Sequence, residues 1–229
     1  MAFSRIQQTS GTNITFASTV TTTAFGSDTT AGNILIAIAE ADTVAANGIT
    51  VTDSKGNSWT RVDSESVAST FDLELWYTVI TTGGSSHTVT ATDTGGGVDS
   101  LLIVEEWSGQ SVSPADKNAS AQDDSGSSTA LDSSATTATA QANELIIGAG
   151  VCSGAITLTE GATFSNKTQV NTVFSTLAFE SKTVSVIGTY NATFTASAGG
   201  SWACIVATFK DVNPGGGKPT VLSLTGVGS

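Results

Sequence analysis

The chain has 229 residues, of which 39% are hydrophobic and only 12% are charged. This hydrophobic content excludes a disordered chain, and the length suits a single β-sandwich domain with a substantial core. Twenty acidic residues against eight basic residues give a formal net charge of −12. Such a charge repels phosphate backbones and anionic lipid surfaces, so we expect neither nucleic acid nor a membrane as a partner.

The N-terminal residues 1–9 contain neither the apolar segment of a signal peptide nor a cleavage site. No stretch of the sequence approaches the length of an apolar transmembrane helix. We therefore expect synthesis in the cytoplasm without export by the usual route.

The first half of the chain carries strand patterns and no amphipathic helical periodicity. Residues 33–39 form a continuous apolar run of strand length. Residues 49–52 and 59–63 flank the turn sequence Asp53-Ser-Lys-Gly-Asn57, which indicates a hairpin. The later strands expected in this half are residues 73–80, 87–91 and 101–107.

The second half repeats this order after a polar connector, residues 108–141, that is poor in large apolar side chains. Its expected strands are residues 143–151, 176–180, 190–196 and 202–209. Residues 31–109 and 142–210 are therefore expected to share one strand topology and to superpose. Because each half has an apolar face to bury, we predict an all-β fold in which residues 1–212 form one domain. This domain is a two-sheet antiparallel β-sandwich, jelly-roll-like, with an internal two-fold pseudo-repeat.

Several short motifs follow the order of a known module. In the first half they are Gly32-Asn-Ile-Leu-Ile-Ala37, Val51-Thr-Asp-Ser-Lys-Gly-Asn-Ser-Trp-Thr60, Leu75-Trp-Tyr77 and Val104-Glu-Glu-Trp-Ser-Gly109. In the second half they are Ala142-Asn-Glu-Leu-Ile-Ile-Gly148, Gly188-Thr-Tyr-Asn-Ala-Thr193 and Ser201-Trp-Ala-Cys-Ile-Val-Ala-Thr-Phe-Lys210. Across residues 30–212 the chain resembles a jelly-roll-like β-sandwich module. Such modules occur in tailed-phage virion proteins, including capsid decoration proteins, and in bacterial surface and carbohydrate-active proteins. The motifs mark strands and turns, so the resemblance implies a fold more than a function.

No set of residues predicts catalysis. The single histidine, His87, has no recognisable nucleophile or orienting partner in the sequence, and we expect it to be exposed at a strand edge. Glu105 and Glu106 are adjacent in a strand and point to opposite faces, so they cannot act as a facing pair, and a solvated strand end is expected. We therefore expect a protein that is not an enzyme and has no catalytic residue.

Two acidic loops could in principle supply oxygen ligands to calcium. Asp123-Asp-Ser-Gly-Ser127 lacks the carboxylate spacing and the closing glutamate of an EF-hand loop. Asp53-Ser-Lys-Gly-Asn57 has Lys55 at its centre and fits a turn better. We therefore expect neither a metal nor another cofactor.

The tryptophans and cysteines allow two interpretations each. Trp59 and Trp107 lie near strand ends and could form a platform on which a sugar ring stacks, although core packing is the commoner fate of a tryptophan in such a strand. Cys152 and Cys204 lie in apolar runs, which favours buried free thiols over a bridge between neighbouring strands.

Residues 213–229 are expected to be a Gly/Pro linker followed by a C-terminal arm, because prolines and glycines stop the last strand. Val221, Leu222 and Leu224 then resume strand-like alternation. The arm either folds back along its own sandwich or adds to a neighbouring subunit, in which case these three residues are the partner contacts.

These observations predict a non-enzymatic virion structural protein, most simply a capsid decoration or cement protein of a tailed bacteriophage. Its partners would be other copies of itself in a homo-oligomer and a major capsid protein, and its location the virion. The alternative is a carbohydrate-binding or adhesin-type module that recognises a surface glycan outside the cell.

Overall fold

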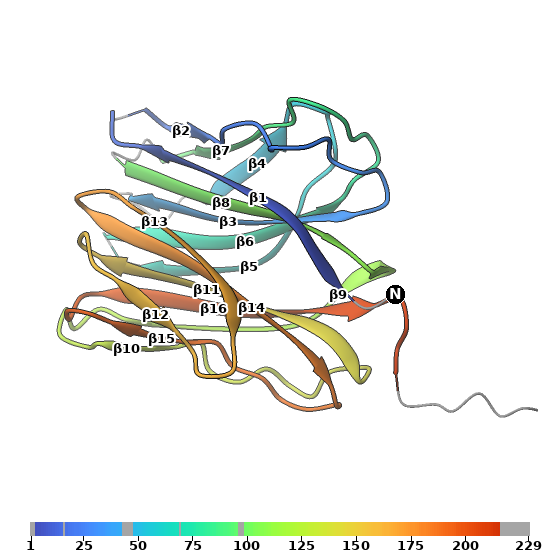
Figure 1. Ribbon diagram of the computed structural model, residues 1–229. Coiled ribbons are helices and arrows are strands. Elements are labelled where there is room, and N and C mark those ends of the chain that lie inside the picture. The colour runs from blue at the N-terminus through green and yellow to red at the C-terminus, as the bar shows by residue number, and fades with distance from the viewer. Residues whose placement is uncertain (1–2, 16, 43–47, 69, 96–98, 216–229) are drawn as a thin grey trace, which may run out of the picture.

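The computed structural model describes residues 3–15, 17–42, 48–68, 70–95 and 99–215, which contain strands and no helix (Figure 1). The strands of the first half are β1 (Ser4–Asn13), β2 (Thr19–Thr21), β3 (Ile34–Asp42), β4 (Ile49–Asp53), β5 (Thr60–Val67), β6 (Phe71–Val79), β7 (Val89–Asp93) and β8 (Asp99–Ser108). Those of the second half are β9 (Gln110–Asp123), β10 (Ala130–Asp132), β11 (Asn143–Ser153), β12 (Leu158–Glu160), β13 (Ser165–Asn171), β14 (Ser175–Ser185), β15 (Thr193–Ala196) and β16 (Trp202–Asp211). The all-β prediction is confirmed.

Four antiparallel sheets are stacked in layers. The two central layers are five-stranded, with the orders β1-β8-β3-β6-β5 and β13-β14-β11-β16-β9. Each is covered on its outer side by a three-stranded sheet, β2-β7-β4 in the first half and β10-β15-β12 in the second (Figure 1). The predicted sandwich is therefore present as the pair of five-stranded sheets, and the two outer sheets add a layer to each half.

Strand order corresponds between the two halves. Each strand of the first half has a counterpart eight strands later in the chain, from β9 for β1 to β16 for β8. With each strand replaced by its counterpart, the order of the first five-stranded sheet becomes the order of the second, read from its other edge. The same substitution converts β2-β7-β4 into β10-β15-β12. That the two backbones superpose as a pseudo-repeat stays a prediction.

Alternation of side chains explains why the central strands are continuous apolar runs. Ile34, Ile36 and Ile38 of β3 belong to the core between the two five-stranded sheets. The intervening Leu35 and Ala37 belong to the core under the three-stranded sheet. A strand buried on both faces has no place for a solvated side chain, so its sequence shows no polar alternation.

The prediction that residues 108–141 form a polar connector is wrong in part. It contains β9, fourteen residues long, which pairs with β16 at the edge of the second five-stranded sheet. Small and polar side chains such as Ala119 and Ser120 suit this edge strand, which is only half-buried. An edge strand of this composition carries no apolar run, so its sequence resembles that of a polar connector.

The prediction for the cysteines is confirmed. Cys152 and Cys204 are free, fully buried thiols on the neighbouring strands β11 and β16. Burial raises the pKa of Cys152 to about 11. Both side chains pack in the core between the second five-stranded sheet and its three-stranded cover, where they act as small apolar groups.

Candidate functional site

The two termini of the described chain meet at one end of the molecule. The backbone amide of Phe3 donates to Asp211 Oδ2 at 3.1 Å, and Asn143 N donates to Pro214 O at 3.2 Å. Asn143 in turn pairs with Ser185 at the end of β14. These contacts bring the start of β1, the end of β14 and the segment after β16 to one place.

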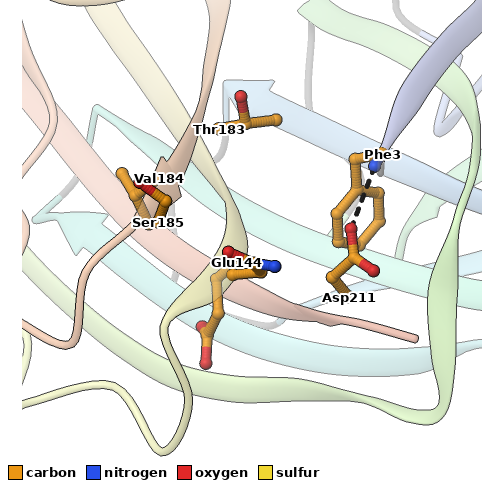
Figure 2. Close-up of a pocket in the computed structure, with 7 residues that line it drawn as sticks. Phe3, Glu144, Thr183, Val184, Ser185 and Asp211 are labelled. Atoms are coloured by element: carbon orange, nitrogen blue, oxygen red, sulfur yellow. Dashed lines mark hydrogen bonds between the residues drawn. The ribbon is translucent and has the colours of Figure 1, made fainter. Parts of the chain in front are cut away.

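A cavity of about 240 Å³ opens at this end. Its lining includes Phe3 and Asp211 from the termini and Thr183 and Ser185 from β14. Figure 2 shows Phe3 hydrogen-bonded to Asp211 on one side of the cavity, with Val184 and Ser185 on the other side. Asp211 Oδ1 also accepts from Asn213 N at 2.6 Å, so this carboxylate is satisfied by the chain itself.

Exposed apolar side chains surround the same end. Val186 and Ile187 directly follow Ser185, Val212 follows Asp211, and Val112 lies on β9 two residues beyond Gln110, which pairs with Asp211. Their exposed fractions are 66%, 56%, 53% and 102%. We call these four residues the terminal surface. Isolated exposed apolar residues are ordinary, but these four lie on segments that end at one place, which makes them a candidate contact surface.

The sequence predictions did not identify the terminal surface. One signal was available: Val186 and Ile187 follow a strand and precede Gly188, a position where polar residues are the usual choice. The predicted contacts Val221, Leu222 and Leu224 lie outside the described residues.

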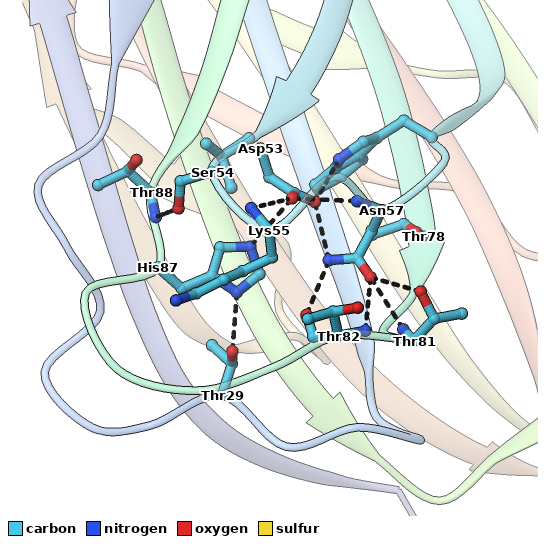
Figure 3. A network of polar contacts seen from close by, with 12 residues as sticks. Thr29, Asp53, Ser54, Lys55, Asn57, Thr78, Thr81, Thr82, His87 and Thr88 are labelled. Carbon is cyan, nitrogen blue, oxygen red and sulfur yellow. Dashed lines mark hydrogen bonds and ion pairs between the residues drawn. The ribbon is translucent and has the colours of Figure 1, made fainter.

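His87 is buried, so the prediction of an exposed strand-edge histidine is wrong. Its Nδ1 lies 2.7 Å from Thr29 Oγ1, and its Nε2 lies 3.5 Å from Asp53 Oδ1 (Figure 3). Burial lowers the pKa of His87 even though Asp53 opposes this, which favours the neutral imidazole. Thr29 is buried as well, so this hydroxyl–imidazole–carboxylate series has no access to a substrate and holds two loops together.

The turn predicted at residues 53–57 is present, and Asp53 organises it. The hairpin predicted across this turn is wrong, because β4 pairs with β7 in the three-stranded sheet whereas β5 pairs with β6 in the five-stranded sheet. Asp53 Oδ1 accepts from the backbone amides of Lys55 and Asn57, and its Oδ2 accepts from Asn57 Nδ2 and from Trp59 Nε1 at 2.9 Å (Figure 3). Burial raises the pKa of Asp53, but these hydrogen bonds outweigh it and hold the pKa below the ordinary value. The carboxylate is therefore a structural anchor.

Replacing Asp53 by Ala is expected to lower the free energy of unfolding by about 2–4 kcal/mol, because the part-buried donors on Asn57 and Trp59 and the two backbone amides of the turn lose their acceptor. Urea unfolding followed by tryptophan fluorescence measures the change. Asp28, which is exposed, provides the control: Asp28→Ala should change the free energy by less than about 0.5 kcal/mol. An Asp53→Ala variant as stable as the control would show that the turn does not depend on the carboxylate.

The solvated strand end predicted for Glu105 and Glu106 is also wrong, since neither side chain is exposed. Glu106 accepts from Thr30 N at 2.9 Å, from Asn33 Nδ2 and from Gln7 Nε2, and so fixes the segment before β3. Glu105 points to the opposite side of β8, where Arg5 Nη2 lies 2.7 Å from its Oε1.

Trp59 and Trp107 do not form a common surface. Trp107 is 3% exposed and lies in the core between the five-stranded sheets. Trp59 packs against the other core of the first half and donates its indole hydrogen to Asp53. The two indoles therefore lie on opposite sides of one sheet.

Three carboxyl groups gather at one end of the core between the five-stranded sheets. Asp42 pairs with Asp99 across β3 and β8, and Glu40 lies two residues along β3 on the same face. Thr172 and Ser175 of the second half donate to Asp99 Oδ2. Neither carboxylate oxygen of Glu40 has a hydrogen-bond partner among the described residues. Burial, then the charges of Asp99 and Asp42, raise the pKa of Glu40 well above its ordinary value.

Within the described ranges, no three His, Cys, Asp or Glu side chains are arranged to hold a metal ion. In the same part of the chain, no helix is long and apolar enough to cross a bilayer. Comparisons of the chain with protein-family models, with curated proteins and with solved structures found no match.

Proposed function

We propose that this protein is a non-enzymatic structural protein that attaches by its terminal surface to a larger particle. The setting favoured by the sequence resemblance is a tailed-phage virion, in which the protein decorates a shell of major capsid protein. The observation that carries the proposal is the gathering of exposed apolar side chains where both ends of the described chain meet.

The low charge of the chain supports the same function. Only 12% of the residues are charged, so a contact made by the terminal surface desolvates few ionised groups. The four-layer body supplies a rigid support, because the described strands are held in sheets and every sheet packs on another. The linker that begins near Asn213 leaves from the same end, which adds a second means of attachment to the same particle.

Strand β14 offers a matched pair of variants to test this proposal. Val186 directly follows its last residue, Val173 lies two residues before its first, and both are exposed. Val186→Asp is expected to abolish co-sedimentation with capsids assembled without this protein, whereas Val173→Asp is expected to retain it. Deleting residues 216–229 should weaken co-sedimentation and leave the fold intact. Equal binding by wild type, Val186→Asp and the deletion variant would refute attachment through this end.

One observation favours the alternative, a glycan-binding module. A groove of about 170 Å³ lies between β5 and β9, and its lining includes Tyr77 together with the polar residues Arg61, Asp116, Lys117 and Asn118. An aromatic face surrounded by hydrogen-bonding groups is a typical way to hold a sugar. Titration calorimetry with a panel of bacterial surface polysaccharides tests this function. Binding that is lost in Tyr77→Ala would support it, and no heat with any polysaccharide would exclude this groove as a site for the panel.

A further inference from the structure

Four side chains meet where an edge strand of the first half faces an edge strand of the second. Arg5 and Gln8 lie on β1, Glu105 lies on β8 opposite Gln8, and Thr168 lies on β13. Gln8 and Thr168 are 160 residues apart in the sequence. The cluster therefore joins the two five-stranded sheets at their edges.

The contacts within this cluster bring a hydroxyl group to a carboxamide and to a carboxylate. Thr168 Oγ1 donates a hydrogen bond to the side-chain carbonyl oxygen of Gln8, so the hydroxyl lies against the carboxamide. Arg5 Nη2 donates to the same carbonyl oxygen and lies 3.2 Å from Thr168 Oγ1. Glu105 Oε1 lies 3.5 Å from Thr168 Oγ1. The Thr168 hydroxyl, a potential nucleophile, thus contacts both a polarised carbonyl group and a carboxylate that can act as a base.

We propose that Thr168 and Gln8 form an intramolecular ester cross-link. Glu105 accepts the hydroxyl proton as Thr168 Oγ1 attacks Gln8 Cδ, which forms the C–O bond and places negative charge on Oε1. Arg5 stabilises that charge. Glu105 then returns the proton to the amide nitrogen, the C–N bond breaks, and ammonia leaves. One threonine hydroxyl and one glutamine carboxamide become an ester and one ammonia, with no oxidant, metal or other co-reactant.

The surroundings suit each of these steps. Burial raises the pKa of Glu105 to about 7, with Arg5 and Trp107 opposing the rise, and a base with such a pKa can both accept and return a proton at neutral pH. Trp107 Nε1 donates to Glu105 Oε2 at 3.0 Å, which leaves Oε1 to face the hydroxyl. Gln8 lies at the surface, so ammonia can escape into solvent. The contact geometry supplies the proximity that an uncatalysed reaction lacks.

The neighbouring Gln7 provides a natural contrast. Its side chain points to the other face of β1, where Nε2 donates to Glu106 and to Ser27 O. Among the described contacts no hydroxyl lies against its carbonyl group, so it lacks the nucleophile. Gln7→Ala is therefore the matched control for Gln8→Ala.

Mass spectrometry of the purified full chain tests the cross-link. The intact mass is expected to be lower than the sequence mass, counted with or without Met1, by one ammonia, about 17 Da. Trypsin should release one joined peptide containing residues 6–55 and 168–182, and hydroxylamine should separate it. Thr168→Val, Gln8→Ala and Glu105→Gln should each lose the joined peptide, whereas Gln7→Ala should keep it.

Two outcomes would overturn the proposal. The first is a wild-type protein with its full sequence mass. The second is an ammonia loss confined to the 6–55 peptide alone, as cyclisation at Asn47–Gly48 would give. Both are read from wild type, so the test stands even if a variant fails to fold.

Discussion

Replacing Phe209 by Ala is expected to lower the free energy of unfolding by about 3–5 kcal/mol, the usual cost of emptying a fully buried phenylalanine site. Phe209 lies on β16 of the second half and is completely buried in the core between the five-stranded sheets. Its ring contacts Tyr77 of β6, in the first half, edge to face with the centroids 5.7 Å apart. The side chain therefore bridges the two halves.

Because this core is shared, both halves should unfold in one transition and both should be destabilised together. Tryptophan fluorescence, which includes Trp76 of the first half and Trp202 of the second, and circular dichroism should give coincident urea unfolding curves. Phe174→Ala is the control, since Phe174 is 47% exposed. It should cost less than about 0.5 kcal/mol. Two separated transitions in wild type would show that each half is an independent domain.

Stability is expected to fall as the pH rises from 6.5 to 8.5, and Glu40→Gln should reduce this fall. Burial, as the largest cause, raises the pKa values of Glu40, Asp99, Glu105 and Glu180, the last two to about 7. A carboxyl whose pKa is higher in the folded state binds more protons there than in the unfolded chain. Its contribution is therefore present at low pH and is lost as the pH rises through the folded pKa. His87, with its lowered pKa, acts in the opposite direction, and its effect is largely complete near the lower edge of this window.

Glu40→Gln removes one of these buried acids while keeping its shape. The stability difference between this variant and wild type should grow by up to about 1.4 kcal/mol per pH unit until the pKa of Glu40 in the folded protein is reached. Urea unfolding at pH 6.5, 7.5 and 8.5 measures it, with Asp28→Asn as an exposed control. A wild-type protein that gains stability over this range, or a variant whose advantage does not change with pH, would contradict the prediction.

The fold class follows from the sequence wherever a strand is buried on both faces. The runs at Leu35, Leu145 and Ile205 are apolar without interruption, and each lies in a central strand. Edge strands lack that pattern. β1 and β9 are half-buried and polar, and the three-residue strands β2 and β10 are too short to show any period.

The buried polar groups could not be predicted, because their partners are distant in the sequence. Buried Glu105 is paired with Arg5 of β1, and buried His87 lies against Thr29 and Asp53. The terminal surface consists of residues from separate segments of the chain, such as Val186 and Val212. A local sequence pattern does not predict that these segments end at the same place. Adjacent residues of a strand point to opposite faces of the sheet, and Glu105 and Glu106 do lie on opposite faces of β8, so that part of the prediction is correct.

The most direct test of the proposed function is to follow the native protein through density-gradient purification of particles from lysates of its natural source, with quantitative mass spectrometry of every fraction. The proposal predicts that the protein bands with intact particles, in a fixed ratio to one major shell protein that persists on re-banding. A protein that stays in the soluble fractions at the top of the gradient, while intact particles band free of it, would contradict the proposal.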